Sequence, residues 1–236
     1  MNSPSNAVPT GARHAGPNLG TVAIVFTILF NLGLYFVSFS SAKPHFPRPW
    51  DSTDTMIAFF QAHSSAVMMF AFFQFGSAIA LGIFTATAVS RLRFLGARAA
   101  GPSIALFGGF ATAFNTALTA LILWVMAYPG IAQNGAVLRA LYYLSFATGG
   151  VGFSAPLGLL MAGISVSAGF MKLLPKWIVI LGIVLAAIGE LSSLSLIFPA
   201  AAFLIPLTRF PGFVWLIAAG FTLPKVASRV SSPAGE

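Results

Sequence analysis

Long apolar stretches dominate this sequence and limit what the chain can fold into. A helix needs about 20 mostly apolar residues to cross the hydrocarbon core of a bilayer, because each residue adds about 1.5 Å. Only 7% of the residues are charged, against roughly 25% in soluble domains, so a water-soluble globule is excluded. The sequence therefore predicts an all-α polytopic membrane protein, a bundle of about six transmembrane helices. They cover residues 20–42, 65–90, 103–127, 137–170, 177–198 and 202–224.

The sequence outside these stretches is short and holds no separate soluble domain. The longest connection covers residues 43–64, and three prolines between residues 44 and 49 predict extended backbone there. Asp51 or Ser52 can then cap a short amphipathic helix, which we expect to continue into the second span. The predicted organisation is a polar N-terminal tail, a single transmembrane domain and a C-terminal tail, at residues 1–19, 20–224 and 225–236.

Lysine and arginine are distributed unequally between the two sides of the predicted bundle. Cytoplasmic loops of membrane proteins carry an excess of these residues. The side that holds both termini has Arg13, Arg91, Arg93, Arg98, Lys172, Lys176, Lys225 and Arg229. The other side has Lys43, Arg48, Arg139 and Arg209. We therefore expect both termini to be cytoplasmic. With the short loops and the absence of cysteine, this distribution favours a bacterial inner membrane.

Charge inside a span is the most informative functional signal, because each buried ion costs at least about 2.5–3.5 kcal/mol on insertion scales. The chain has four acidic residues, and Glu190 is the one that falls inside a span. Arg209 lies at nearly the same depth in the next, antiparallel span, and helices joined by a short connection are neighbours. We therefore expect an ion pair between Glu190 and Arg209. It either locks the last hairpin together or forms a proton or ion site with Glu190 as the carrier.

Uncharged polar residues extend this pattern into the other spans. In the third span, Thr112, Asn115, Thr116 and Thr119 recur at i, i+3, i+4 and i+7. This spacing puts all four on one face of the helix. Such residues either join helices to one another or line a hydrated cavity near the membrane midplane. With the charged pair, the candidate substrate- or ion-binding residues are Asn31, Gln74, Thr112, Asn115, Thr116, Glu190, Ser193 and Arg209.

A run of helix-weakening residues falls in the middle of the fourth span. It contains Gly149, Gly150, Gly152 and Pro156. Proline lacks a backbone N–H, so Pro156 leaves the carbonyl of Gly152 without its usual partner. The run is either a kink that allows close packing, or a broken helix whose freed backbone coordinates a solute or ion.

Catalytic and cofactor motifs are not found in the sequence. It contains no His-Glu-x-x-His, no Gly-x-Ser-x-Gly, no phosphate-binding loop and no dinucleotide fingerprint. The spacing of His45, Asp51, Asp54 and His63 matches no metal-ligand motif. The basic residues are spread singly along the chain, which argues against nucleic acid as a partner. We therefore expect no metal, no cofactor and no enzymatic activity.

Two functions remain open. The first is a carrier of a small solute or ion, with or without proton coupling, whose polar site at the midplane surrounds the Glu190–Arg209 pair. The alternative is a non-catalytic accessory or assembly subunit of a larger membrane complex, in which the pair is a structural lock. The expected partners are the lipid bilayer and either a second copy of the chain or other subunits.

Overall fold

The computed structural model describes residues 11–38 and 45–227. Within this part the regular structure is helical, apart from one isolated bridge between Arg13 and Val226. The predicted all-α class is therefore confirmed. The helices are α1 (Leu19–Ser38), α2 (Thr53–Ala62), α3 (Ser64–Phe94), α4 (Gly101–Met126), α5 (Pro129–Ala132), α6 (Gly135–Gly149), α7 (Val151–Phe170), α8 (Lys176–Leu191), the 3₁₀ helices η1 (Ser192–Leu196) and η2 (Pro199–Phe203), and α9 (Leu204–Thr222).

Six helical segments in the described part of the chain are long and apolar enough to cross a membrane. They agree with the predicted spans, although several of them begin or end a few residues away from the predicted limits. By length and composition, the chain is therefore built as a polytopic membrane protein. The six segments are Leu19–Ser38, Ser64–Phe94, Gly101–Met126, Gly135–Phe170, Lys176–Leu196 and Pro199–Thr222.

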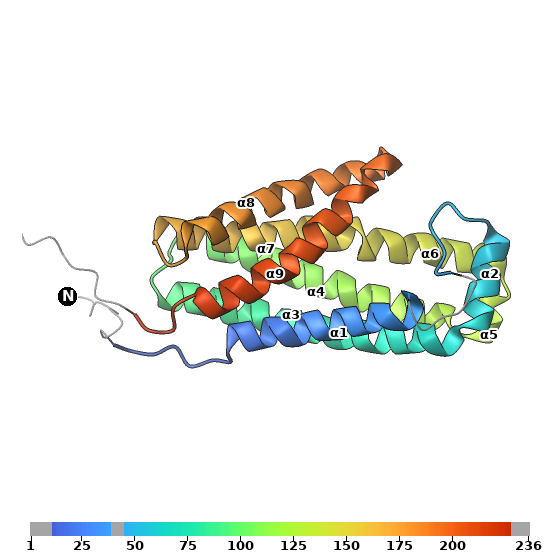
Figure 1. The fold of residues 1–236 in the computed structure, drawn as a ribbon, viewed down its shortest axis with the longest axis horizontal. Helices are drawn as coiled ribbons and strands as arrows, with labels where there is room; N and C mark the ends of the chain where they lie inside the picture. The colour runs from blue at the N-terminus through green and yellow to red at the C-terminus, as the bar shows by residue number, and fades with distance from the viewer. Residues whose placement is uncertain (1–10, 39–44, 228–236) are drawn as a thin grey trace, which may run out of the picture.

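The long helices form an elongated bundle (Figure 1). Helix α3 packs against α1 and α4, and α4 packs in turn against α7. Helix α8 lies on α7, and α9 then crosses back over the bundle to pack against α1 and α8. The short helices α2 and α5 lie beside α6 at the end of the bundle far from the termini.

The two ends of the described chain meet at the same end of the bundle. Backbone hydrogen bonds of 2.8–3.3 Å join residues 11–14 to residues 225–227. Beneath them Arg91, which is fully buried, donates hydrogen bonds to the carbonyl oxygens of Pro17 and Leu223. Both ends of the described chain therefore lie on one side, as expected. Which side of the membrane that is stays a prediction.

The unequal distribution of basic residues persists in the folded chain, with two differences from the predicted one. Arg91 is an interior residue rather than a loop residue, and Arg209 lies inside the bundle. Lys43 and Arg229 lie outside the described residues. The basic residues near the end that holds the termini are Arg13, Arg93, Arg98, Lys172, Lys176 and Lys225, against Arg48 and Arg139 near the opposite end.

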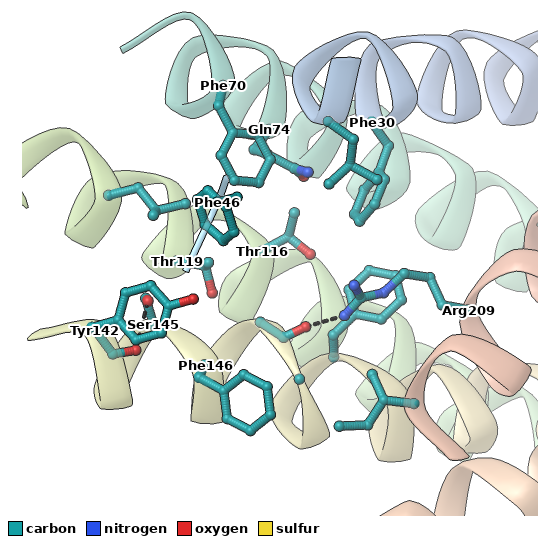
Figure 2. Close-up of a pocket in the computed structure, with 16 residues that line it drawn as sticks. Phe30, Phe46, Phe70, Gln74, Thr116, Thr119, Tyr142, Ser145, Phe146 and Arg209 are labelled. Carbon is teal, nitrogen blue, oxygen red and sulfur yellow. Dashed lines mark hydrogen bonds between the residues drawn. The ribbon is translucent and has the colours of Figure 1, made fainter. Parts of the chain in front are cut away.

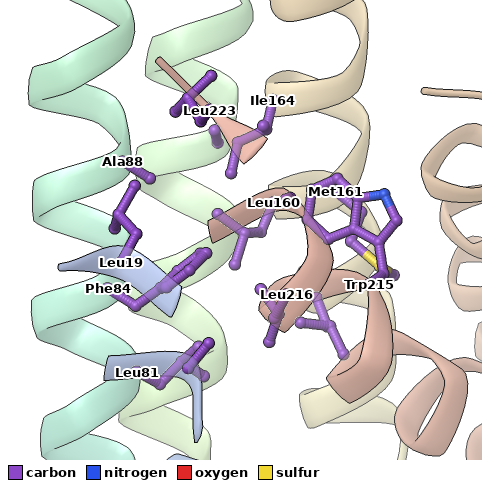
Figure 3. Close-up of a cluster of buried hydrophobic side chains, with 14 of the residues drawn as sticks. Leu19, Leu81, Phe84, Ala88, Leu160, Met161, Ile164, Trp215, Leu216 and Leu223 are labelled. Carbon is purple, nitrogen blue, oxygen red and sulfur yellow. The ribbon is translucent and has the colours of Figure 1, made fainter. Parts of the chain in front are cut away.

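Two clusters of buried apolar side chains hold the bundle together. The larger one joins α1, α3, α4, α7, α8 and α9 in the half nearer the termini, and Figure 3 shows part of it. Its largest member, Trp215, is fully buried and donates a hydrogen bond of 2.8 Å from Nε1 to the carbonyl of Ile178. The second cluster lies beneath α2 and contains Met56, Phe59 and Phe60, all fully buried.

The connection before the second span folds partly as predicted. The Ser52 hydroxyl accepts a hydrogen bond from the Thr55 backbone N–H and so caps α2. The prediction that this helix continues into the next span is wrong, because the backbone leaves helical geometry at His63 (φ −125°, ψ 27°). This break turns α2 away from the direction of α3, and the apolar side chains of α2 form part of the second cluster.

Candidate functional site

A cavity of about 190 Å³ lies inside the bundle, lined by members of both apolar clusters (Figure 2). Residues of α1, α3, α4, α6, α7 and α9 contribute to its wall, so a bound molecule would contact most of the bundle. The lining residues are Phe30, Leu34, Phe46, Phe70, Gln74, Thr116, Thr119, Leu123, Tyr142, Ser145, Phe146, Gly149, Gly150, Phe153, Ile205 and Arg209.

The cavity lies at an interruption of the fourth span. Helix α6 ends at Gly149, Gly150 adopts φ −89° and ψ −99°, and α7 begins at the next residue. The N–H of Phe153, which would bond to the carbonyl of Gly149 in a continuous α-helix, bonds to that of Gly150 instead, at 3.2 Å. The interruption therefore frees the Gly149 carbonyl, whereas Gly152 and Pro156 lie within α7 and do not line the cavity.

Arg209 of α9 occupies this interruption. Its Nη2 donates a hydrogen bond to the freed Gly149 carbonyl, drawn as the dashed line in Figure 2. Its Cζ lies 5.5 Å from the ring centre of Phe30 and 4.8 Å from that of Phe153, distances typical of cation–π contacts. Its Nε is buried and has no hydrogen-bond partner among the described residues. The guanidinium is thus held in place and keeps an N–H group without an acceptor.

The hydroxyl groups around the cavity donate their hydrogen bonds to backbone carbonyls. Those of Thr116, Thr119 and Ser145 donate to carbonyls three or four residues earlier in their own helices, at 2.7–2.8 Å. The Tyr142 hydroxyl donates to the carbonyl of Pro47. The hydroxyl oxygens keep lone pairs that can still accept. Among the described lining residues, the side-chain N–H donors are therefore those of Arg209 and of the Gln74 amide, which point into the same space in Figure 2.

The predicted ion pair between Glu190 and Arg209 does not form. Arg209 bonds to the Gly149 carbonyl, the Glu190 side chain is exposed on the outside of α8, and no ion pair joins them. Helix α8 turns Gly189 toward α7, where an added Cβ would lie 2.7 Å from the carbonyl oxygen of Ser154. Because successive residues of a helix are about 100° apart, Glu190 then faces away from the bundle.

The other predicted site residues divide into two groups. Gln74 and Thr116 line the cavity together with Arg209, Gly149 and Gly150. The remaining uncharged polar residues do not line it. Each donates to a carbonyl oxygen three or four residues earlier in the chain: Thr112 to Gly108, Asn115 to Ala111, Asn31 to Thr27 and Ser193 to Glu190. That the first group binds a solute stays a prediction.

Several lining residues were not among the predicted site residues. Tyr142, Ser145, Phe146 and Gly149 recur at i, i+3, i+4 and i+7, so one face of α6 carries all four. This periodicity is present in the sequence and could have identified them. Phe46 comes from the proline-rich connection, where it packs edge-on against Phe70, and no sequence pattern predicts that the connection folds back over the bundle.

Metal ligands do not gather in the described part of the chain, where no group of three or more His, Asp or Glu side chains could hold an ion. Asp51 accepts a backbone hydrogen bond from Arg48, and the His63 ring contacts the carbonyl of Phe59.

No protein-family model, curated protein or solved structure matches this chain. The cavity is therefore the feature of the molecule that indicates its function.

Proposed function

We propose that this protein is a membrane carrier for a small solute and that the cavity around Arg209 is its binding site. The observation that carries the proposal is a guanidinium inside the bundle without a carboxylate partner. Ionisable residues in membrane spans are costly and are typically found where a substrate or ion is handled. Among the described residues, Arg91 is also buried without a carboxylate and with its Nε unpartnered, but it does not line the cavity, whereas Arg209 does.

The interruption between α6 and α7 supports the same proposal. Carriers commonly bind their substrates near the midplane, at helices that are broken there. Here the break at Gly150 and the cation from α9 meet in one cavity. A solute that binds the Arg209 guanidinium would compete with the Gly149 carbonyl for its N–H groups. Binding of the solute would therefore weaken the contact between α9 and the interruption at Gly150. Glu190, outside the cavity, has no part in this mechanism.

The proposed location is a bacterial inner membrane, with both termini in the cytoplasm. The support for this orientation is the excess of basic residues at the end of the bundle that holds Arg13 and Lys225. Positive charge retained at one end is typical of the cytoplasmic side. The solute would then cross between the cytoplasm and the compartment that faces α2.

The absence of cysteine allows a direct test of access to the cavity. Thr116→Cys and Ser145→Cys place a single thiol in its wall, and Ala187→Cys, on the exposed side of α8, serves as the control. In sealed vesicles, we expect a charged, membrane-impermeant thiol reagent to label the two cavity positions from either side. The control should stay unlabelled, because the reactive thiolate does not form in contact with lipid.

Labelling from both sides is what distinguishes a carrier from a simple pocket. A carrier opens its site to each side in turn, so the reagent reaches Thr116→Cys in one population of molecules whichever side it is added to. Labelling from a single side, however long the exposure, would contradict the carrier and leave a receptor-like pocket. No labelling from either side would remove the cavity from consideration as a solute site.

One observation favours the alternative of an accessory subunit, namely the outer face of α8. Glu190 is exposed there among apolar side chains that include Ile183, Val184 and Leu191. A carboxylate facing lipid is costly, so a partner subunit with a basic or hydrogen-bonding group would stabilise it. For this function we expect native mass spectrometry in mild detergent to show a complex with other subunits, which Glu190→Leu disrupts. A wild-type protein that purifies alone would contradict the alternative.

A further inference from the structure

The volume of the cavity indicates the size of the group that it can enclose. An engineered protein cavity of about 150 Å³ is known to hold one benzene molecule. The cavity here, at about 190 Å³, is somewhat larger. It therefore has room for one six-membered ring, or a branched aliphatic group of similar size, together with one small polar group. A disaccharide, a nucleotide or a long acyl chain exceeds this volume.

The wall of the cavity determines the character of most of the ligand. Half of its sixteen lining residues are phenylalanine, leucine or isoleucine, and five of these are phenylalanines: Phe30, Phe46, Phe70, Phe146, Phe153, Leu34, Leu123 and Ile205. Aromatic rings favour contact with another ring in offset or edge-to-face geometry. An inorganic ion alone would leave this apolar wall in contact with water, which is unfavourable. The ligand should therefore have a compact apolar body.

The donors in the cavity determine the polar group of the ligand. The hydroxyl groups that line the cavity already donate hydrogen bonds to backbone carbonyls. The side-chain N–H donors of the lining residues are those of Arg209 and Gln74. These groups need an acceptor. The guanidinium is the one charged group among the lining residues, so a group with a single negative charge would neutralise the site. A planar carboxylate fits the fork of an arginine with two parallel hydrogen bonds.

We infer that the cavity binds a small organic monocarboxylate, with its carboxylate on Arg209 and its single ring or branched body among the phenylalanines. This inference rests on the proposed function of the same cavity and names the substrate class that the carrier would transport. Phosphate esters are disfavoured, because a phosphate carries about −1.5 to −2 charges at pH 7 and one guanidinium leaves it undercompensated.

The test compares probes of equal shape and different charge on the wild-type protein. Benzoate and benzamide differ only in the polar group, and chloride and inorganic phosphate lack the apolar body. Binding is measured by isothermal titration calorimetry in nanodiscs, and by protection of Thr116→Cys from the thiol reagent. We expect benzoate to bind and protect, benzamide to bind at least about tenfold more weakly, and the two inorganic anions to give no protection at the same concentration.

Variants then assign the preference to Arg209. Arg209→Gln should lower benzoate affinity at least about tenfold and abolish the preference over benzamide. Glu190→Gln, outside the cavity, should bind benzoate as the wild type does. Because the comparison of probes uses the wild-type protein, the inference can be tested even if the Arg209 variant fails to fold.

The outcomes separate this inference from the proposed function. Equal binding of benzoate and benzamide, or equal protection by chloride or phosphate, would overturn the monocarboxylate as the ligand. If Thr116→Cys is labelled from both sides but benzoate gives no protection, the inference fails and the carrier stands. If Thr116→Cys is not labelled at all, both fail together.

Discussion

The variant Arg209→Met is expected to lose carboxylate binding while unfolding at nearly the same temperature as the wild-type protein. A cation held inside a bundle without a carboxylate loses solvation that its contacts recover only in part. Methionine has a similar length and can contact the rings of Phe30 and Phe153 through its sulfur, which is worth about 0.3–1.5 kcal/mol. The bond to the Gly149 carbonyl is lost, but the uncompensated charge is lost with it.

These opposing terms make a small net change. The hydrogen bond from a charged donor contributes about 1.5–3 kcal/mol, and each cation–π contact about 0.5–1 kcal/mol or more. Desolvation of an unpaired ion costs several kcal/mol in the opposite direction. We therefore expect an unfolding temperature within about 4 °C of the wild type, equivalent to about 1 kcal/mol for a chain of this size. Benzoate affinity should fall at least about tenfold.

Arg139→Met is the matched control, because Arg139 is also half-buried but does not line the cavity. Its guanidinium donates to the Thr53 hydroxyl at 2.9 Å and the Tyr143 hydroxyl at 3.0 Å, and so holds α2 against α6. The control should lose about 1–2 kcal/mol of stability and keep benzoate binding. If Arg209→Met proves less stable than Arg139→Met, then Arg209 is a structural link between α9 and the α6–α7 break, and the carrier proposal loses its main support.

The number of spans could be predicted from the sequence, because it depends on a quantity that runs along the chain. Apolar stretches give the spans, and the rise of about 1.5 Å per residue gives depth within a span. The direction in which a side chain points depends instead on how helices pack. The sequence predicts similar depths for Glu190 and Arg209, but close contact of α7 with Gly189 turns Glu190 outward. Depth alone therefore predicted an ion pair that packing prevents.

The difference between features that run along the chain and features that depend on packing also explains which other residues of the cavity could be predicted. Glycine and proline are abundant between residues 148 and 156, so the sequence could predict a weak point in the helix. It could not predict which residue interrupts the helix. The interruption is at Gly150, where Arg209 bonds to the carbonyl before it, while Pro156 is accommodated within α7. Phe46 reaches the cavity because Tyr142 holds the carbonyl of Pro47, a contact between residues far apart in the chain.

The substitution Gly108→Ala is expected to cause one of the largest losses of stability from a single added methyl group. Helices α4 and α7 approach so closely that a Cβ at this position would lie 2.5 Å from the carbonyl oxygen of Pro156 and 2.6 Å from the amide nitrogen of Leu160. Both are backbone atoms, which cannot rotate away as a side chain can. The two helices must therefore separate, and membrane helices depend on such close packing for their association. We expect a loss of about 3 kcal/mol, at the upper end for overpacking.

Gly82→Ala provides the control, since it adds the same methyl group to a helix with space beside it. The nearest atom to a Cβ at Gly82 is Cε1 of Phe110, at 4.0 Å, which is an ordinary contact. This variant should be as stable as the wild type or gain about 0.5–1 kcal/mol, because alanine loses less backbone entropy than glycine in a helix. Both effects can be measured by unfolding in mixed micelles with increasing denaturing detergent, followed by circular dichroism.

The Gly108→Ala variant also tests whether the packing of α4 on α7 sets the shape of the cavity. Thr116 and Thr119 of α4 and Phe153 of α7 all line it, so separation of these helices should widen it. Any folded fraction of the variant should then discriminate less between benzoate and larger carboxylates, since specificity for size depends on a close fit. Equal stability of Gly108→Ala and Gly82→Ala would show that α4 and α7 can move apart freely. A cavity between such helices could not select a ligand by its volume.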